Sequence, residues 1–583
     1  MKNHFHLKCK GLGLYFIAMF NLLLMHYYIL IKCRLEEATD TLLWIDNLLG
    51  IVCDLTIILL LSLFVTRRKQ LLSLYLTNIV TLSWSFSNIL YSRFFHHYIS
   101  LSAIEQVGNL ADSFMLRNII ERFQWTDGYF LIILILTTWI YNSSRKNENI
   151  FKYASILIKW PIMILSLNLV FHVIFCILTP GLHSFSYLRH RIYVRHFELL
   201  HSSAEPNWAS FHRGAVRQII IPYIYQTFSN TELTEEQREN IKKEYSDHKR
   251  RLSNSTKKVR NKNIIFIIVE SYLSVTSDLT INGREITPFL NSLKRDSTIY
   301  FNGNVKPNIT IGESSDGQFL YMTGLLPLRS EVTVTKAKYS ELPGLPKLLK
   351  QDNIIKEAQM IIPTLPSMWE QESMCEKYGF DHLYSSADYQ NGRYWYLSDR
   401  QIFKYAIEKH RSSYQPFLSV ILTMTMHQPY NTTIDSTFII NDNSLTEKYR
   451  NYLNVCHYTD EQIRFYFEEL KKEGLYDNSL IVIVADHHAH PSLFDMKEED
   501  FPIDIPLYII NGNINNSTAW QGECNQLDVY TTLLDIVGIT TLWKGFGNTL
   551  INLDYSNSIR PELWSMSENI ILGNYFRERA GFN

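Results

Sequence analysis

Residues 263–270 read NIIFIIVE, an apolar run that ends in a carboxylate. An apolar run of this length without polar alternation is typical of a strand that is buried on both faces. Similar runs follow at residues 417–423, 480–485 and 507–510. Helical patterns lie between them, including a long one over residues 445–472. Strands that alternate with helices predict an α/β domain with a mainly parallel central sheet.

The residues that precede this domain have the pattern of a membrane protein. About 20 apolar residues in a helix cross the core of a bilayer. Five segments reach or approach this length: 11–31, 42–65, 71–95, 129–141 with its flanks, and 159–179. Clusters of Lys and Arg precede the first segment, follow the second and separate the fourth from the fifth. Because basic residues stay in the cytoplasm, five spans place everything after Pro180 outside it.

We therefore expect three parts: a transmembrane domain over residues 1–180, an extracytoplasmic helical linker over 181–262, and the α/β domain over 263–583. In the linker, Thr234 and Gln237 have the spacing of a helix capping box. The whole chain has 56 basic and 57 acidic side chains, a net charge of −1. This balance provides no general basic surface for a phosphate backbone, so we expect no nucleic-acid partner.

Asp54 lies inside the second apolar segment, where a carboxylate is costly unless it faces protein or water. Two interpretations are open. Asp54 has a function in the membrane, or it packs against polar residues of the third segment, which offers Ser83, Ser85 and Asn88.

Polar side chains follow the buried strands of the α/β domain. Glu270 ends the first strand, His427 follows the second, and Asp486 and His487 follow the third. Active-site groups of parallel sheets gather at these carboxyl ends, and carboxylates with an imidazole suit a metal ion. The alternative is that Asp486 and His487 belong to a polar, solvated loop.

A nucleophile is offered by residues 311–319, IGESSDGQF, in a turn that leads into a helix. Ser314 and Ser315 both provide a hydroxyl there. From the residues alone, capping of the helix is the commoner role of serine at such a position.

The chain carries a series of motifs in a fixed order: NIIFIIVES, TPFLNSL, GESSDGQF, MHQPY, HYTDEQI, LIVIVADHH and QLDVYTTLLDIVGI. Over residues 263–554 this series resembles the sulfatase-like domain of the lipoteichoic acid synthase and phosphoglycerol transferase group, within the alkaline phosphatase and sulfatase superfamily. The five-span layout is also similar. The resemblance implies that Glu270, Asp486 and His487 ligate one divalent ion. It also implies that Ser314, at the position of the family's threonine nucleophile, contacts the same ion.

The resemblance extends to the substrate pocket. His427 in MHQPY matches a family histidine near the transferred phosphate, and Trp369 matches a pocket tryptophan. Two positions depart from the family: its pocket arginine is Gln371 here, and a pocket histidine is Ile362. The substrate of this chain can therefore differ.

The function that the resemblance implies is phosphotransfer at the outer face of a bacterial cytoplasmic membrane. A phospho-alcohol group, in first place phosphoglycerol, would pass from a membrane phospholipid through a covalent Ser314 intermediate to a glycan or glycolipid acceptor. The metal ion would activate the hydroxyl and neutralise phosphoryl charge. Oxygen ligands with one imidazole favour Mn²⁺, with Zn²⁺ or Mg²⁺ as alternatives.

Other activities are weighed against this one. A phosphoethanolamine transferase would share the metal and nucleophile, and a hydrolase would deliver the phosphoryl group to water. A true sulfatase requires a C/S-x-P-x-R segment for conversion of its Cys or Ser to formylglycine. Here Ser314 is followed by Ser-Asp-Gly-Gln, so hydrolysis of sulfate esters is disfavoured. A scaffold protein that had lost catalysis is disfavoured, because the expected metal ligands are present.

Overall fold

The computed structural model divides the chain into two compact units. The N-terminal unit comprises Met1–Asn230 with Arg329–Glu331, and the C-terminal unit comprises Thr231–Leu328 and Val332–Asn583. The structure describes residues 2–32, 41–66, 69–95, 98–99, 123–145, 214–220, 232–247, 258–329 and 331–577 without 367, 393–395, 429, 431–438, 490–500 and 558, and the single residues 104, 159, 162, 163, 166, 210 and 223.

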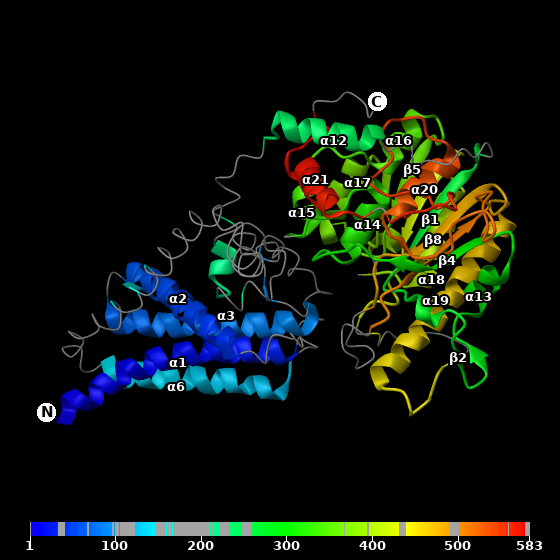
Figure 1. Ribbon diagram of the computed structural model, residues 1–583. Coiled ribbons are helices and arrows are strands. Elements are labelled where there is room, and N and C mark those ends of the chain that lie inside the picture. Colours follow the sequence, from blue (N-terminus) through cyan, green and yellow to red (C-terminus); the bar gives the residue numbers. More distant parts are fainter. Residues whose placement is uncertain are drawn as a thin grey trace. The chain divides into compact units, whose positions relative to one another are not determined.

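Four long helices form the described part of the N-terminal unit: α1 (Lys2–Lys32), α2 (Thr41–Val65), α3 (Gln70–Phe95) and α6 (Gly128–Arg145), the last preceded by the short helix η3 (Trp125–Asp127) (Figure 1). They coincide with the first four expected spans. Among the described helices, α1 is long and apolar enough to cross a membrane over Gly13–Ile31, and α2 has a shorter apolar part over Gly50–Val65. Nearly all of the fifth expected span, 159–179, lies outside the described residues. The number of five spans therefore stays a prediction.

Polar contacts join these helices. The Asn78 side-chain amide donates to the Leu14 carbonyl at 2.8 Å, and the Ser85 hydroxyl donates to the Asn21 carbonyl at 2.9 Å. Interhelical hydrogen bonds of this kind hold helices together where apolar surroundings supply no hydrophobic driving force between them. The Ser and Asn content of the third apolar segment is thus explained by its contact with α1.

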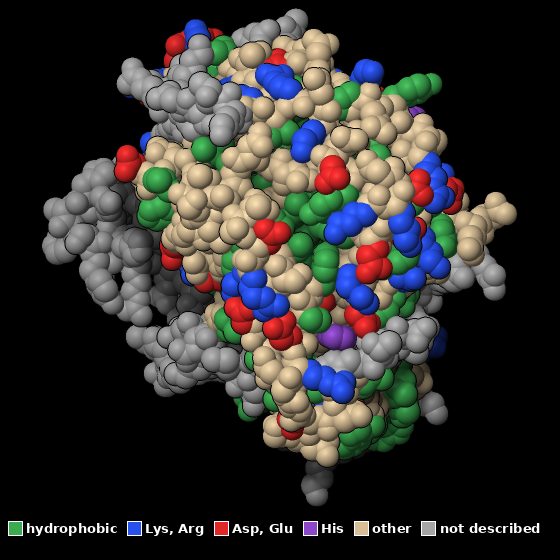
Figure 2. All heavy atoms as spheres, turned by 90° about the vertical axis from the view of Figure 1, so that its right-hand side faces the viewer, with side chains coloured by type: hydrophobic (Ala, Val, Ile, Leu, Met, Phe, Trp, Pro, Cys, Tyr) green, Lys and Arg blue, Asp and Glu red, His purple; other side chains and the backbone are tan. Residues whose placement is uncertain are grey.

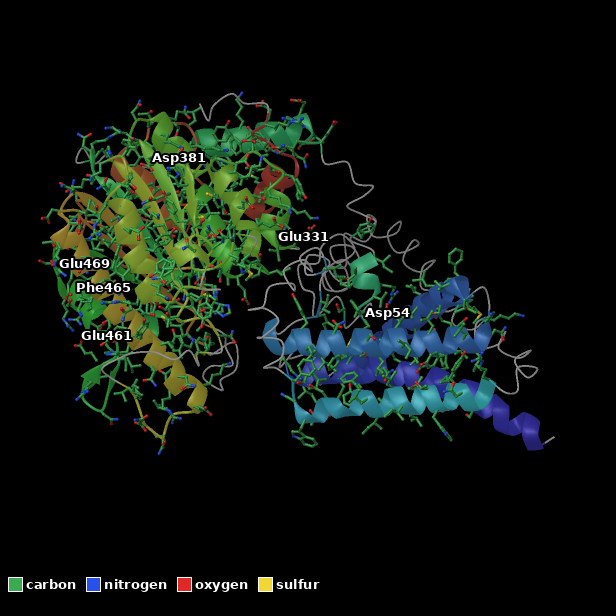
Figure 3. The ribbon with its side chains drawn as sticks, turned by 180° about the vertical axis from the view of Figure 1, so that it is seen from behind. Asp54, Glu331, Asp381, Glu461, Phe465 and Glu469 are labelled. Carbon is green, nitrogen blue, oxygen red and sulfur yellow. The ribbon has the colours of Figure 1, made fainter. Side chains whose placement is uncertain are left out.

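Asp54 projects from α2 and is buried (Figure 3). Its carboxylate accepts the backbone N–H groups of Val216 and Arg217 at 2.9 and 3.1 Å, and Arg217 Nε lies 3.8 Å away. The structure thus gives Asp54 hydrogen-bond partners that neither of the two interpretations named. A segment about 160 residues later in the chain supplies its partners instead.

A single eight-stranded sheet forms the centre of the described C-terminal unit, in the order β10-β4-β9-β8-β1-β7-β5-β6. Its strands are β1 (Asn263–Val269), β4 (Tyr300–Lys306), β5 (Glu357–Ile361), β6 (His382–Tyr384), β7 (Phe417–Leu422), β8 (Ser479–Ala485), β9 (Ile505–Ile510) and β10 (Cys524–Asn525); β2 (Thr280–Ile281) and β3 (Arg284–Glu285) form a separate pair. Neighbouring strands are parallel except where β9 pairs with β4 and β8. The predicted mainly parallel sheet is confirmed as a mixed sheet with one antiparallel strand.

The register of the central strands brings their carboxyl ends together. In β1, Ile268 pairs with Leu422 of β7, and Val269 pairs with Ala485 of β8. The residues that follow these three strands consequently emerge at one edge of the sheet. All seven residues of β1 are buried, as its continuous apolar run predicts.

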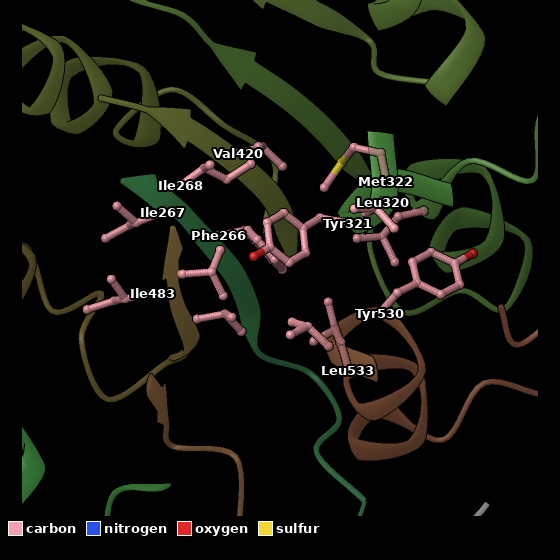
Figure 4. Packing of buried hydrophobic residues seen from close by; sticks show 14 of the residues in the cluster. Phe266, Ile267, Ile268, Leu320, Tyr321, Met322, Val420, Ile483, Tyr530 and Leu533 are labelled. Atoms are coloured by element: carbon pink, nitrogen blue, oxygen red, sulfur yellow. The ribbon is translucent and has the colours of Figure 1, made fainter. Parts of the chain in front are cut away.

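Helices cover both faces of this sheet (Figure 1). The described helices of this unit are α12 (Glu235–Asp247), α13 (Pro288–Arg295), α14 (Ser314–Thr323), α15 (Thr333–Ala337), α16 (Leu345–Gln351), α17 (Gln371–Tyr378), α18 (Asp399–His410), α19 (Glu447–Lys472), α20 (Asp528–Val537) and α21 (Pro561–Leu572), with the short helices η8 (Ser274–Thr276), η9 (Met368–Glu370) and η10 (Tyr389–Gly392). Phe266 of β1 packs against Tyr321 of α14 with ring centroids 5.3 Å apart, and Tyr530 and Leu533 of α20 lie on the same side (Figure 4). This core fixes the position of α14 over the centre of the sheet.

The helix starts follow the sequence signals in part. The capping box of α12 is confirmed, since Gln237 N donates to Thr234 Oγ1 and Thr234 N donates to Gln237 Oε1. Helix α13 begins at Pro288 after Thr287, and the Thr287 side chain makes no capping hydrogen bond, although threonine before proline is a typical helix start. Asp460 of α19 accepts the N–H groups of the first turn instead.

Basic and acidic side chains are interspersed on the face of the molecule that Figure 2 shows. Several pairs of opposite charge lie on the C-terminal unit, among them Lys294 with Asp278 and Arg411 with Glu473. Exposed pairs of this kind contribute little to stability individually.

Candidate metal centre and nucleophile

Two carboxylates and an imidazole meet at the carboxyl ends of β1 and β8. Glu270 follows β1, and Asp486 and His487 follow β8. One ligand atom from each lies within 4.8 Å of the others. His487 Nε2 is 3.5 Å from Glu270 Oε1 and 3.6 Å from Asp486 Oδ2, and all three residues are buried. The structure therefore brings together the three residues that the sequence offered as metal ligands.

Hydrogen bonds orient these side chains toward one point. Asp486 Oδ1 accepts the N–H groups of Ser271 and His487, both at 2.8 Å, so Oδ2 faces the cluster. The Ser271 hydroxyl donates to Glu270 Oε1 at 2.8 Å. His487 Nδ1 lies 2.6 Å from the His488 carbonyl oxygen. Because a carbonyl accepts only, Nδ1 carries a proton, and Nε2 is the ring nitrogen that faces the carboxylates.

The electrostatics of the cluster call for a cation. Burial and the charge of Glu270 raise the pKa of Asp486. Burial also opposes ionisation of Glu270, but the hydrogen bond with His487 and the positive charge of His427 and His487 outweigh it and lower the pKa of Glu270. Asp486 and Glu270 raise the pKa of His487 well above its usual value against the effect of burial. A divalent ion would compensate both carboxylates, so the donor set fits one.

Ser314 is the first residue of α14, and its hydroxyl lies within this cluster. Ser314 Oγ is 3.1 Å from His487 Nε2 and donates to Glu270 Oε2 at 3.3 Å. Glu313, the residue before it, has φ 43° and ψ −112°, a combination that L-residues rarely adopt. Backbone strain of this kind concentrates at functional sites.

Helix α14 approaches the end of β8 closely. A Cβ added to Gly317 would lie 2.1 Å from the Asp486 carbonyl oxygen. Only glycine at this position allows the helix to bring Ser314 beside Asp486 and His487. In the motif GESSDGQF, Gly317 is thus needed for close packing and Ser314 supplies the hydroxyl.

No described side chain caps α14, so the capping role that is commoner for serine at such a position is wrong here. The Ser315 hydroxyl donates to the Gly312 carbonyl at 2.8 Å. The Asp316 carboxylate accepts hydrogen bonds from Thr310, Gly312 and Thr333, which hold the loop in front of the helix. These contacts fix the turn that carries Ser314.

His427 lies on the loop after β7, close enough for its charge to lower the pKa of Glu270. Its Nδ1 is 2.7 Å from the Gln428 carbonyl oxygen, so Nδ1 donates a hydrogen bond to that oxygen. Trp369 has φ 50° in a loop that packs against the hydrophobic core. No contact between Trp369 and Ser314 is present among the described residues.

A contact between Gln318 of α14 and Gln371 of α17 was not predicted from the sequence. The side-chain amides of Gln318 and Gln371 form a reciprocal buried pair at 3.0 and 2.8 Å. Gln318 lies one turn after Ser314, and Gln371 stands at the position of the family's pocket arginine. The pair therefore joins the Trp369 loop to the nucleophile helix through neutral groups. No local sequence signal indicated this contact.

The mixed sheet with helices on both faces, and a cluster of two carboxylates, one histidine and one serine at the strand ends, define a sulfatase-like enzyme. The sulfatase family matches residues 262–539. The lipoteichoic acid synthase N-terminal domain matches residues 1–193. The chain thus carries a sulfatase domain after a lipoteichoic acid synthase N-terminal domain, in the order that the resemblance predicts, and the resemblance is confirmed.

Several characterised proteins are similar over most of the chain. Lipoteichoic acid synthase 2 of Bacillus subtilis is 27% identical over 78% of this chain and 70% of its own length. Lipoteichoic acid synthase-like YvgJ of the same organism is 26% identical over 90% of this chain and 86% of its own length. The crystal structure of lipoteichoic acid synthase LtaP from Listeria monocytogenes aligns with a TM-score of 0.44 and 19% identity, over 54% of this chain and 81% of that chain.

Proposed function

We propose that this chain is a metal-dependent phosphotransferase that moves a phospho-alcohol group from a membrane phospholipid to an acceptor outside the cytoplasm. The observation that carries the proposal is the position of Ser314 Oγ, 3.1 Å from His487 Nε2 and 3.3 Å from Glu270 Oε2. A serine hydroxyl in such a cluster has the surroundings that an activated nucleophile needs.

Glu270, Asp486 and His487 would hold one divalent ion, with Ser314 as a further ligand. The oxygen-rich donor set with one imidazole favours Mn²⁺ over Zn²⁺ and Mg²⁺. When bound, the ion would lower the pKa of the serine hydroxyl and offset the charge of the phosphoryl oxygens.

In the first half of the reaction, Ser314 releases its proton to solvent and Oγ forms a bond to phosphorus. The bond between phosphorus and the diacylglycerol oxygen breaks, and His427 Nε2 donates a proton to that oxygen. Diacylglycerol leaves, and the phospho-alcohol group remains on Ser314. Proton donation by a positioned imidazole typically contributes a factor of about 10² to 10⁴.

In the second half, the hydroxyl group of the acceptor attacks the same phosphorus and returns a proton to His427 Nε2. The bond from phosphorus to Ser314 Oγ breaks, and the serine takes up a proton. A glycan or glycolipid hydroxyl would serve as acceptor, whereas water in its place would make the enzyme a hydrolase.

Phosphoglycerol is the first choice of transferred group, because the relatives are named lipoteichoic acid synthases. Phosphoethanolamine is the second choice. The observation in its favour is the neutral Gln318–Gln371 pair, which stands where the family has an arginine. A pocket that lacks the arginine has one positive charge fewer. It therefore repels the ammonium group of phosphoethanolamine less strongly.

The test is to incubate the detergent-purified full chain with Mn²⁺ and either labelled phosphatidylglycerol or labelled phosphatidylethanolamine. Release of diacylglycerol from one lipid identifies the donor. A labelled head group found on Ser314 by mass spectrometry identifies the intermediate, and free head-group phosphate reveals hydrolysis. If neither lipid yields diacylglycerol, or if the adduct is absent under conditions of turnover, the proposed function is wrong.

A further inference from the structure

The loop after β7 links the candidate metal centre with His427. At its start, Thr423 Oγ1 accepts the N–H of Glu270 at 3.0 Å, and Thr423 N donates to the Ile268 carbonyl at 3.0 Å. Farther along, His427 N donates to the Met424 carbonyl at 3.0 Å, which closes a turn. The position of His427 therefore depends on where residues 423–426 are held.

The carboxylate of Asp399, the first residue of α18, holds this loop. Asp399 Oδ1 accepts the N–H groups of Met424 and Thr425, both at 2.9 Å. The N–H of Asp399 in turn donates to Thr425 Oγ1 at 3.1 Å. Asp399 is completely buried, so these contacts form away from solvent. Hydrogen bonds from backbone amides to an ionised carboxylate are stronger than those between neutral groups.

A third element fixes the carboxylate. The hydroxyl of Thr459, in the middle of α19, donates to Asp399 Oδ2 at 2.6 Å. One carboxylate oxygen thus binds the loop and the other binds α19. Thr459 belongs to the motif HYTDEQI, and the proposed reaction assigns no task to that motif.

We propose that Asp399, oriented by Thr459, is a positioning residue that sets the loop so that His427 Nε2 faces the leaving oxygen. This inference rests on the proposed function, in which His427 donates a proton to that oxygen. Displacement of a catalytic group by about 1 Å can cost roughly 100-fold in rate. The hydrogen bonds of Asp399 go to Met424, Thr425 and Thr459, so its main effect should be on the loop that carries His427 and not on the bond from Ser314 to phosphorus.

The neighbouring residue Asp460 provides a matched control. It is also buried, and it also accepts two backbone N–H groups, those of Phe289 and Leu290 at 2.9 and 2.8 Å. Its contacts are with α13 and not with the loop of His427. Asp399→Ala and Asp460→Ala therefore each remove two hydrogen bonds from backbone N–H groups to a buried carboxylate, at different places; Asp399→Ala also removes the bond from Thr459.

The experiment compares two donors in the full detergent-purified chain: a phospholipid with an alkyl leaving oxygen, and a phosphodiester of 4-nitrophenol, whose leaving group needs no proton. Asp399→Ala and Thr459→Val should lower kcat on the phospholipid roughly 100-fold, with KM changed less than about threefold. On the nitrophenyl ester the loss should be under about fivefold. Asp460→Ala should show no difference between the two donors.

Asp399→Asn should restore most of the activity. The asparagine carbonyl can accept both loop amides, and its NH₂ can donate to Thr459, whose hydroxyl reverses its role. If Asp399→Ala lowers kcat on both donors equally, or if Asp399→Asn is as impaired as Asp399→Ala, the inference is overturned.

A second readout does not depend on activity. The rate at which diethyl pyrocarbonate modifies His427, measured by mass spectrometry against exposed His382, should rise at least threefold in Asp399→Ala and stay unchanged in Asp460→Ala. If the wild-type chain transfers nothing while this rise is seen, the proposed function has failed but the positioning of His427 stands. An unchanged rate in Asp399→Ala would refute the positioning itself.

Discussion

The substitution Gly317→Ala tests whether the close approach of α14 to β8 builds the site. The new Cβ would lie 2.1 Å from the Asp486 carbonyl oxygen, and that oxygen belongs to backbone held on both sides. Tyr321 donates to the preceding Ala485 carbonyl, and Gln526 donates to the Asp486 carbonyl itself at 2.6 Å. The helix and the strand end must therefore separate by more than about 1 Å to reach ordinary van der Waals distance.

A shift of this size acts directly on the nucleophile, because Ser314 lies one turn before Gly317 in the same helix. Misplacement of a reacting group by about 1 Å costs roughly 100-fold in turnover. Overpacking of a buried site also destabilises the fold by about 1 to 3 kcal/mol. We expect Gly317→Ala to lose turnover at least 100-fold and to bind Mn²⁺ more weakly, since Asp486 is one of the proposed ligands.

Gly344→Ala is the matched control. Its Cβ would lie 2.0 Å from the Tyr378 carbonyl oxygen, so the clash is equal in kind, but it occurs between α16 and α17. Thermal unfolding, titration calorimetry with Mn²⁺ and turnover of phospholipid should be measured for both variants. We expect similar losses of stability, with turnover per folded molecule reduced less than about threefold in Gly344→Ala. The reasoning is refuted if folded Gly317→Ala turns over as fast as Gly344→Ala.

Three further predictions follow from single features of the structure. Ser314→Ala should abolish turnover with little effect on stability, while Ser315→Ala should cost about 1 kcal/mol for its hydrogen bond to Gly312 and remain active; a phospho-adduct on Ser315 in mass spectrometry would contradict this assignment. Chelation of metal should abolish turnover and lower the thermal midpoint, because two buried carboxylates lose their counter-charge, and Mn²⁺ should restore both; full activity of metal-free protein would end the metal hypothesis. Burial lowers the pKa of His410 to about 3 from 6.5, so its neutral form stabilises the fold above pH 6.5 and this contribution is lost as the pH falls toward the folded pKa. The loss should reach about 1.4 kcal/mol per pH unit below pH 6, and His410→Gln should flatten the fall in unfolding midpoint between pH 7 and 5; an unchanged slope would show that other groups dominate.

The sequence by itself determined the features that depend on short stretches of chain. Continuous apolar runs predicted β1, β7, β8 and β9, because a strand buried on both faces has no polar positions. The long pattern before β8 predicted α19, and the pair Thr234 and Gln237 predicted the start of α12. The carboxyl ends of the strands likewise indicated where Glu270, Asp486 and His487 would meet, since parallel strands in register deliver their following residues to one edge.

The family motifs added what periodicity could not supply. Strand patterns alone left Ser314 as a helix cap and Asp486 and His487 as a possible solvated loop. The order of the motifs selected Ser314 as the nucleophile, and the structure then placed its hydroxyl among the three expected ligands. Which metal, donor and acceptor the chain uses stays a prediction for the experiments above.

Only the tertiary structure decided the contacts between residues that are distant in the chain. Asp54 pairs with backbone of residues 216 and 217, Asp460 caps α13 in place of Thr287, and Asp399 holds the loop of His427. The tertiary structure also decided that β9 is antiparallel to its neighbours, because an apolar run does not indicate the direction of a strand. A carboxylate meets its partner through folding of the intervening 25 to 171 residues. No local pattern encodes that partner, because many backbone amides would satisfy the same oxygen equally well.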